Sequence, residues 1–214
     1  MEKNKAEFIY SVLEQLYPKT KSFLNYSKDY ELLFATILSA QATDASVNKA
    51  TQILFVRFPS LSDYTNENLP EIFDCVKSLG LGKSKSLHLV QSAKMLLEDY
   101  HGIVPQDREE LMKLPGVGYK TSGVVLAELY SYPYIPVDTH VQRVSIRLGF
   151  VKANSVPEKT ELALEKQYKN QKGIELHHRF ILFGRNYCKA INPLCSSCPL
   201  KDICGYKNKK AVPK

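Results

Sequence analysis

The sequence of 214 residues lacks the features of a membrane or exported protein. No apolar run approaches the ~20 residues that a bilayer-spanning helix needs. The first residues, Met1 to Glu7, contain no apolar signal-peptide core. We therefore expect a soluble, cytoplasmic protein. A hydrophobic content of 44% is enough for the cores of one large domain or two small ones.

Acidic residues are scarce toward the C-terminal end. From Arg185 to Lys214, Asp202 stands alone against seven Lys and Arg residues, so this segment carries +6 of the formal net charge of +7. An excess of positive charge favours a polyanionic partner, although moderate basicity also occurs in proteins that never touch nucleic acid. The local concentration of the charge is the stronger signal.

The sequence also lacks period-two alternation of apolar residues and any internal repeat, which argues against sheets and solenoids. Apolar residues recur at helical spacing, so we expect an all-α protein. Pro18 ends a first helix, Asp44 caps a third that stops near Pro59, and Ser155 opens a later one through a capping box. The expected apolar faces are Phe8, Val12, Leu13 and Leu16; Leu32 to Leu38; Val47, Ala50 and Leu54; Leu69, Ile72, Phe73, Val76 and Leu79; Leu87, Val90, Ala93, Met95 and Leu97; and Leu162 and Leu164.

The segment Leu111–Leu148 contains a predicted helix, a glycine hairpin and further helices. Leu114-Pro115-Gly116-Val117-Gly118 cannot continue a helix, because proline lacks an N–H and both glycines can take positive φ. Lys120 then falls in the first turn of a new helix. Bare amides of Gly116 and Gly118 before a helix start are suited to hold a phosphate.

Four of the five cysteines form a C-x6-C-x2-C-x5-C motif, Cys188, Cys195, Cys198 and Cys204. Four thiolates suit either tetrahedral zinc or an iron–sulfur cluster, and composition alone does not decide between them. Structural zinc sites more often use two close pairs, whereas only Cys195 and Cys198 are close here, which favours a cluster. The ordinary alternative is four unrelated buried cysteines. Cys75, on an apolar-periodic helix, is expected to fill the core.

Lys120 and Asp138 each have an ordinary and a chemical interpretation. A lysine on a helix is most often a solvated charge, and an aspartate just before Thr139 is most often an N-cap. The positive end of a helix dipole, however, disfavours a nearby ammonium group, and a neutral amine is a nucleophile. Asp138 then acts as a proton acceptor or as an anion facing developing positive charge. One aspartate can do both.

Together, LPGVGYKTSGVVL, VDTH, LSAQATD and the cysteine motif resemble the endonuclease III family of DNA glycosylase/AP lyases, within the helix-hairpin-helix superfamily. The resemblance covers the chain from the first helix to Cys204. It implies two helical domains flanking a DNA-binding cleft. Residues 22–132 form a six-helix barrel with the hairpin, and residues 1–21 and 133–214 form a discontinuous domain with a [4Fe-4S] cluster on Cys188, Cys195, Cys198 and Cys204.

The resemblance also implies the reaction. Lys120 is the nucleophile that forms a Schiff base with the deoxyribose after a damaged pyrimidine is flipped out, and β-elimination then cleaves the strand 3′ to the abasic site. Asp138 assists the displacement of the base. The protein acts in base-excision repair on double-stranded DNA with damaged pyrimidines or abasic sites, as a monomer, at the nucleoid in a bacterium. The implied DNA contacts are Gln41, Leu81, Gly116, Gly118, His140, Arg143, Arg185 and Lys189.

The sequence departs modestly from the family pattern. Tyr119 stands where many members have arginine. Gly82 stands where a bulkier side chain is usual, so this loop leaves open which residue inserts into the DNA as a wedge. Two other interpretations remain open. One keeps the lyase chemistry but changes the lesion, to a pyrimidine dimer or a mismatched base. The other is a non-enzymatic helix-hairpin-helix DNA-binding protein whose metal site is structural or redox-sensing.

Overall fold

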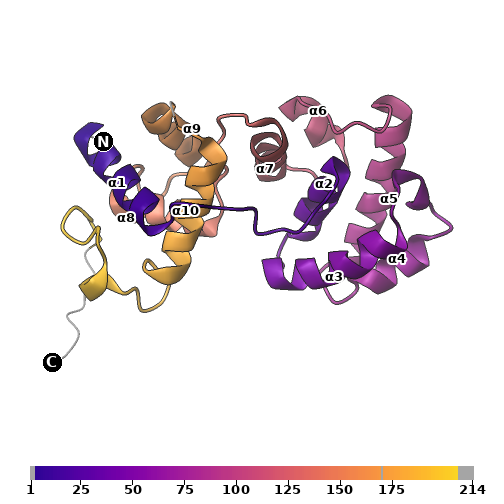
Figure 1. Cartoon of the computed structure of the whole chain (residues 1–214), viewed down its shortest axis with the longest axis horizontal. Coiled ribbons are helices and arrows are strands. Elements are labelled where there is room, and N and C mark those ends of the chain that lie inside the picture. The colour runs from indigo at the N-terminus through magenta and orange to yellow at the C-terminus, as the bar shows by residue number, and fades with distance from the viewer. Residues whose placement is uncertain (1–2, 170, 207–214) are drawn as a thin grey trace. The chain divides into compact units, whose positions relative to one another are not determined.

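The structure is a computed structural model that describes residues 3–169 and 171–206 (Figure 1). Within these ranges every regular element is helical, as the periodicity predicts. None of the helices described is long and apolar enough to cross a bilayer. The elements are α1 (Lys3–Leu16), α2 (Asp29–Leu38), α3 (Asp44–Arg57), η1 (Leu61–Asp63), α4 (Leu69–Val76), α5 (Gly82–Asp99), α6 (Arg108–Lys113), α7 (Tyr119–Tyr130), α8 (Thr139–Leu148), α9 (Pro157–Tyr168), α10 (Gly173–Asn186) and η2 (Cys195–Ser197).

The chain divides into two compact units, which we describe separately. The hairpin unit, Ser22–Tyr130, contains α2 to α7. Its central helix is α2, whose nine residues from Tyr30 to Leu38 are all buried and which packs against α3, α5 and α7. A helix that is apolar all round must be surrounded by other helices, because a one-sided partner would leave apolar surface in water. The hairpin that precedes α7 is thereby fixed to a rigid core.

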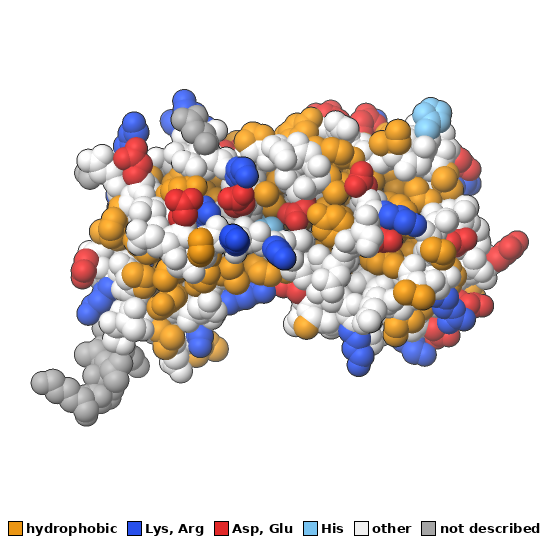
Figure 2. Space-filling model, in the orientation of Figure 1, with side chains coloured by type: hydrophobic (Ala, Val, Ile, Leu, Met, Phe, Trp, Pro, Cys, Tyr) orange, Lys and Arg blue, Asp and Glu red, His pale blue; other side chains and the backbone are white. Residues whose placement is uncertain are grey.

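The cysteine unit comprises Met1–Lys21 and Ser131–Lys214. In it α10 packs against α8 and α1, while α9 packs against α1 and α8. Ile9, Leu13, Phe180 and Phe183 are among its fully buried side chains. The division falls two residues before the boundary expected at 132. On the face shown in Figure 2, basic and acidic side chains are interspersed in both units, so this face carries no patch of a single sign.

Two predicted helix starts are wrong by one residue each. The cap of α3 is Thr43, whose side chain accepts a hydrogen bond from the Ser46 amide, and Asp44 is instead the first helical residue. Similarly, Val156 and not Ser155 occupies the N-cap of α9, without a side-chain hydrogen bond. A hydroxyl placed one residue further from the helix cannot reach the amides that a cap must satisfy.

Three predicted helix faces are also partly wrong. In α1 the buried residues are Ala6, Ile9 and Leu13, while Phe8 is 48% exposed. In α5 the buried apolar residues are Leu89, Val90, Ala93 and Leu96, and both Leu87 and Leu97 are exposed. Leu162 of α9 is exposed as well. In each case small or polar residues share the core stripe, so large apolar residues alone misplace its centre.

Candidate active site and metal centre

The hairpin between α6 and α7 is held by a few specific hydrogen bonds. The Val117 amide donates to the Leu114 carbonyl (3.1 Å), and the Ser92 hydroxyl of α5 donates to the Pro115 carbonyl (3.1 Å). Gly116 has a φ of +81°, whereas Gly118 does not take positive φ, contrary to the freedom expected of both. The carbonyl of Gly118 accepts from Ser122 and so begins α7 (3.0 Å).

The amides of Gly116 and Gly118 are unused by the protein. Among the described residues neither N–H donates to a protein acceptor, and both glycines are exposed. They lie directly before the positive end of α7, where bare N–H groups and the helix dipole both favour an anion. This hairpin therefore has the chemistry of a phosphate-binding turn.

We expect Gly116→Ala to destabilise the hairpin unit and Gly118→Ala to be tolerated. A Cβ at Gly116 would lie 2.7 Å from His88 Nδ1 and 3.0 Å from Ile37 Cγ2, on a backbone at φ +81°, whereas a Cβ at Gly118 meets nothing within 4 Å. Left-handed backbone and a clash together cost about 1–3 kcal/mol. Urea unfolding of both variants measures the difference. Equal unfolding free energies for the two variants would contradict this account.

Lys120 is the second residue of α7, immediately after the hairpin, and its side chain is exposed. Beside it, the Arg108 guanidinium of α6 stacks on the ring of Tyr119. The distance from the guanidinium carbon to the ring centroid is 4.1 Å. This cation–π contact joins the start of α6 to the start of α7. Tyr119 thus stiffens the base of the hairpin next to the candidate nucleophile.

Gln41 and Leu81 lie on two loops that meet within the hairpin unit. Both are exposed, and both have left-handed backbone, with φ of 54° and 63°. A Cβ on Gly80 would lie 3.8 Å from the Gln41 carbonyl oxygen, so the loops are in contact. Left-handed backbone in non-glycine residues costs free energy and concentrates at functional sites. Leu81 is 58% exposed, which leaves its apolar side chain available to another molecule.

The structure explains the unusual Gly82. A Cβ at this position would lie 3.0 Å from Lys77 Cα and 3.2 Å from the Val76 carbonyl oxygen. Only glycine lets α5 begin this close to the end of α4. Gly82 is therefore a packing residue, and Leu81 is the apolar side chain that this loop presents.

Asp138 is the N-cap of α8 in the cysteine unit. Its Oδ1 accepts a hydrogen bond from the Val141 amide (2.7 Å), and the side chain is half-buried. The segment that leads to it is fixed by α10. Gly173 begins α10 so close to the Tyr134 carbonyl that a larger residue would clash, and His177 Nδ1 is 2.6 Å from the Pro136 carbonyl oxygen. The carboxylate keeps a second oxygen for chemistry while it caps the helix.

His140 and Arg143 follow Asp138 on α8 and contact each other. Arg143 Nη2 donates to His140 Nδ1 (3.1 Å) and to the Gly184 carbonyl (3.0 Å), and Nε donates to the Cys188 carbonyl (2.9 Å). Because arginine has only donors, Nδ1 of His140 accepts, and burial lowers the pKa of this histidine. Arg143 thus ties α8 to α10, while Arg185 and Lys189 remain exposed.

The described residues include three of the seven basic residues of the C-terminal segment. Lys207, Lys209, Lys210 and Lys214 lie outside the described residues, so the tail contributes Arg185, Lys189 and Lys201 to the described surface. The concentration of charge in the sequence is consequently only partly visible in the structure. The candidate DNA contacts of this segment are limited to Arg185 and Lys189.

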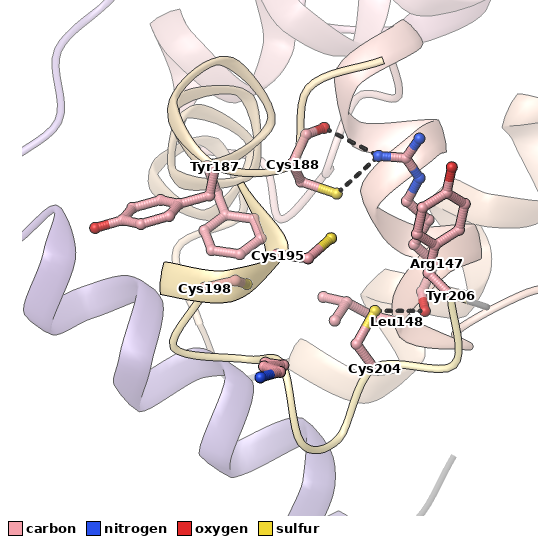
Figure 3. Close-up of a pocket in the computed structure, with 10 residues that line it drawn as sticks. Arg147, Leu148, Tyr187, Cys188, Cys195, Cys198, Cys204 and Tyr206 are labelled. Carbon is pink, nitrogen blue, oxygen red and sulfur yellow. Dashed lines mark hydrogen bonds between the residues drawn. The ribbon is translucent and has the colours of Figure 1, made fainter. Parts of the chain in front are cut away.

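One pocket of the cysteine unit is lined by Cys188, Cys195, Cys198 and Cys204 (Figure 3). None of the four is in a disulfide bond. The loop of residues 188–204 wraps around this pocket, with Leu148 and Phe183 among its apolar walls. Burial raises the pKa of Cys188, and the neighbouring Arg147 opposes the rise by hydrogen bonding to the sulfur. Four side chains that can bind a metal, all of them thiols, thus line the same pocket.

Four thiols that line one pocket are the ligand set of either a zinc ion or an iron–sulfur cluster. A zinc ion holds four sulfurs at about 2.3 Å, which requires them to be mutually close. Yet among the described residues no three His, Cys, Asp or Glu side chains are grouped as a single metal ion requires. An iron–sulfur cluster binds its cysteines through different iron atoms, so its four sulfurs lie farther apart than those around one zinc ion.

Comparison with known proteins agrees with this geometry. A family model described as "HhH-GPD superfamily base excision DNA repair protein" matches residues 34–170, and the "Iron-sulfur binding domain of endonuclease III" matches residues 188–204. Endonuclease III of Bacillus subtilis (strain 168) is 41% identical over 198 residues, which cover 92% of this chain and 90% of that protein. The chain belongs to the endonuclease III family. Its resemblance to that family is confirmed.

Further endonuclease III proteins resemble the chain over nearly its full length. That of Escherichia coli (strain K12) is 40% identical over 209 residues, covering 98% of this chain and 99% of that protein. A trapped endonuclease III–DNA covalent intermediate is 41% identical, with a TM-score of 0.90 and 96% of both chains covered. A non-covalent endonuclease III–DNA complex matches with a TM-score of 0.91. The predicted all-α fold is therefore that of the endonuclease III structures.

Arg147 is a site residue that the sequence analysis missed. It lines the cysteine pocket and donates a hydrogen bond to the sulfur of Cys188 (3.4 Å). A signal was present, because Arg147 follows Arg143 at i+4 and so lies on the same face of α8. A second missed contact is His88 of α5, which lies against Gly116 in the hairpin unit and whose Nε2 is 3.3 Å from the Ser84 hydroxyl.

In this endonuclease III relative we expect Cys198→Ser to lose the bound iron and Cys75→Ser to keep it. Serine is a poor substitute for a soft thiolate ligand of iron, and Cys198 lines the pocket. Cys75 belongs to α4 of the hairpin unit, where burial raises its pKa. Iron per chain and visible absorbance of both purified variants are the measurements. Full iron content in Cys198→Ser, or its loss in Cys75→Ser, would refute the assignment.

Proposed function

We propose that the chain is a bifunctional DNA glycosylase/AP lyase of base-excision repair that removes oxidised pyrimidines and then cleaves the strand. The observation that carries this proposal is the position of Lys120. Its amine is exposed on the first turn of α7, directly after the free amides of Gly116 and Gly118. A phosphate held on these amides places the adjacent deoxyribose within reach of the amine.

The chemistry assigned to Lys120 is covalent. Nζ attacks C1′ of the damaged nucleotide, the N-glycosidic bond breaks, and the base leaves with a proton. Ring opening gives an iminium ion between Nζ and C1′. Loss of a proton from C2′ then expels the 3′ phosphate, which breaks the strand, and water releases the enzyme from the sugar. Trapping of a covalent DNA complex with another endonuclease III supports this assignment.

We assign to Asp138 the stabilisation of positive charge on the sugar and the acceptance of protons during displacement. The hydrogen bond from Val141 fixes one carboxylate oxygen, so the group is held in place before the substrate binds. Preorganised charge of this kind acts on the transition state without a cost of reorientation. His140, Arg185 and Lys189 of the same unit are proposed to contact the DNA backbone. Arg143 is proposed to hold them in position through its hydrogen bonds to His140 and to the Gly184 and Cys188 carbonyls.

Gln41 and Leu81 are proposed to enter the space left by the flipped nucleotide. Their loops touch, both side chains are exposed, and both backbones are left-handed. Gln41 would fill the vacated position with a polar group, and Leu81 would wedge the opposite strand. A damaged pyrimidine stacks weakly, so eversion costs at most a few kcal/mol. This lowers the barrier for damaged nucleotides more than for intact ones.

The four pocket cysteines are proposed to hold a [4Fe-4S] cluster. These cysteines would hold a cluster against the loop of residues 188–204 and so order that loop. Such a short loop contains little apolar core of its own, so its folding depends on ligation. Lys189 and the basic end of α10 are thereby given a fixed position from which to bind DNA.

The test uses purified holoprotein and duplexes that differ in one nucleotide. We expect borohydride to trap a covalent adduct with duplex carrying one oxidised thymine or one abasic site, and none with undamaged duplex. Multi-angle light scattering of the complex tests the proposed monomer. Binding to all three duplexes with no adduct on any would instead identify a non-enzymatic DNA-binding protein. An adduct confined to duplex with a pyrimidine dimer or a mismatch would keep the lyase and change the lesion.

A further inference from the structure

Arg147 is the residue that contacts the cysteine loop at both of its ends. At the start of the loop its guanidinium donates four hydrogen bonds. The acceptors are the Cys188 carbonyl (3.4 Å) and sulfur (3.4 Å), the Lys189 carbonyl (2.8 Å) and the Ala190 carbonyl (3.3 Å). The close-up in Figure 3 shows the guanidinium directed at Cys188, with dashed lines to its carbonyl oxygen and its sulfur.

The end of the loop is held by the backbone of the same residue. The Arg147 carbonyl accepts from the Gly205 amide (3.1 Å) and, while Cys204 is protonated, from its thiol (3.3 Å). A cysteine that ligates iron has lost this proton, so the Gly205 hydrogen bond is the one that holds this end when iron is bound. The Tyr206 ring then lies 4.1 Å from the guanidinium carbon, which it covers on one side. One residue of α8 therefore joins the first cysteine of the motif to the residues that follow the last.

The bond to the Cys188 sulfur has an electronic consequence when a cluster is bound. A hydrogen bond to a cysteine ligand withdraws negative charge from the sulfur, which stabilises the reduced, more electron-rich state of the cluster. Arg147 also brings a permanent positive charge, and it is half-buried, so the effect is less screened than at an exposed site. Both contributions raise the reduction potential.

Arg143 does not share this contact. It bonds to the Cys188 carbonyl through Nε (2.9 Å), and its other acceptors are His140 Nδ1 and the carbonyls of Gly184 and Thr139. Arg143 thus supports the backbone of the loop, whereas Arg147 bonds to the sulfur as well. Both arginines bring a positive charge close to Cys188, and they differ in the hydrogen bond to its sulfur, which Arg147 makes and Arg143 does not.

We propose that Arg147 is a positioning residue that sets the reduction potential of the iron–sulfur cluster and protects it from oxidative loss. It does so through the hydrogen bond to Cys188 Sγ and by closing the loop against oxidants with Tyr206. The proposal rests on iron–sulfur binding by Cys188, Cys195, Cys198 and Cys204. It does not depend on Lys120 chemistry, so it is tested with readouts that require no DNA cleavage.

The experiment compares Arg147→Gln and Arg147→Lys with the wild-type holoprotein. Protein-film voltammetry measures the reduction potential. Ferricyanide, which takes electrons from the cluster, starts iron release, and a chromogenic chelator follows it. We expect Arg147→Gln to lower the potential and to release iron roughly tenfold or more faster, as is typical when a partner of a metal ligand is removed. Arg147→Lys keeps the positive charge but loses the planar guanidinium that reaches several acceptors at once, so we expect a reduction potential between those of wild type and Arg147→Gln.

The matched control is Lys152→Gln, which removes one positive charge from an exposed position of the cysteine unit that has no proposed contact with the cysteine loop or with DNA. We expect its iron release to stay within twofold of wild type. If Arg147→Gln fails to acquire iron, the role in closing the loop is supported and Arg147→Lys carries the measurement of potential. Wild-type potential and iron release in both Arg147 variants, with iron fully loaded, would overturn the proposal.

Discussion

We expect Lys120→Gln to abolish the borohydride-trapped adduct and to reduce base removal and strand cleavage by about 10⁶-fold, the scale for loss of a covalent nucleophile. Glutamine has similar length but an amide nitrogen that cannot attack a sugar carbon. Single-turnover kinetics on duplex with one oxidised thymine measure both steps. DNA binding should persist, because the amides of Gly116 and Gly118 belong to the backbone.

The matched control for this variant is Lys113→Gln. Lys113 also ends in an exposed amine, one helix earlier, where it pairs with Glu110 (2.6 Å) and has no proposed role in chemistry. Its loss should change a surface ion pair worth less than about 1 kcal/mol and leave the adduct intact. Persistence of the adduct in Lys120→Gln would move the nucleophile elsewhere, whereas loss of adduct in Lys113→Gln would show that the assay reports general damage.

The turns and the candidate chemical residues of this protein were predictable because their signals are local. Proline and glycine between Leu114 and Gly118 exclude a helix whatever the tertiary context, and the structure places the hairpin there. The capping role of Asp138 is equally local, since its side chain bonds to an amide three residues ahead. Four cysteines at short spacing are likewise a local signal, and they line one pocket.

Helix faces and long-range supports were less predictable. The core stripe of α1 includes Ala6 and omits Phe8, because the identity of the packing partner decides which residues are covered. Arg147 acquires its role only from a loop that begins 41 residues later. His88 likewise meets Gly116 through folding alone. Such contacts depend on how the helices pack against one another, and helix packing cannot be derived from the local pattern of one sequence.

The strain in the two candidate insertion loops was also invisible in the sequence. Gln41 and Leu81 are residue types that normally avoid positive φ, so their composition predicts ordinary connections. The structure shows both in left-handed backbone and exposed. This combination costs stability and is retained in native proteins mainly where function requires it. The family resemblance had already pointed to Gln41 and Leu81, and their exposed, left-handed backbone supports that interpretation independently.

We expect Asp138→Asn to separate the two roles of this residue. Asparagine is as good an N-cap as aspartate, so the Val141 hydrogen bond and the free energy of unfolding should change by only a few tenths of a kcal/mol. The negative charge is lost, and base removal should slow by roughly 10²–10⁴-fold, the range for a positioned acid–base group. Asp138→Ala loses both functions and should in addition destabilise the unit by about 1 kcal/mol.

The matched control is Asp107→Asn at the N-cap of α6. Asp107 accepts hydrogen bonds from the amides of Glu109 (2.8 Å) and Glu110 (3.0 Å) and has no proposed chemistry. The same substitution at the two caps should thus have the same small effect on urea unfolding. In single-turnover base removal, Asp138→Asn should be slow, whereas Asp107→Asn should keep the wild-type rate. Wild-type rates in Asp138→Asn would mean that the carboxylate only caps α8. Because an asparagine cap leaves the helix intact, a slow Asp138→Asn enzyme points to the missing charge and not to unfolding.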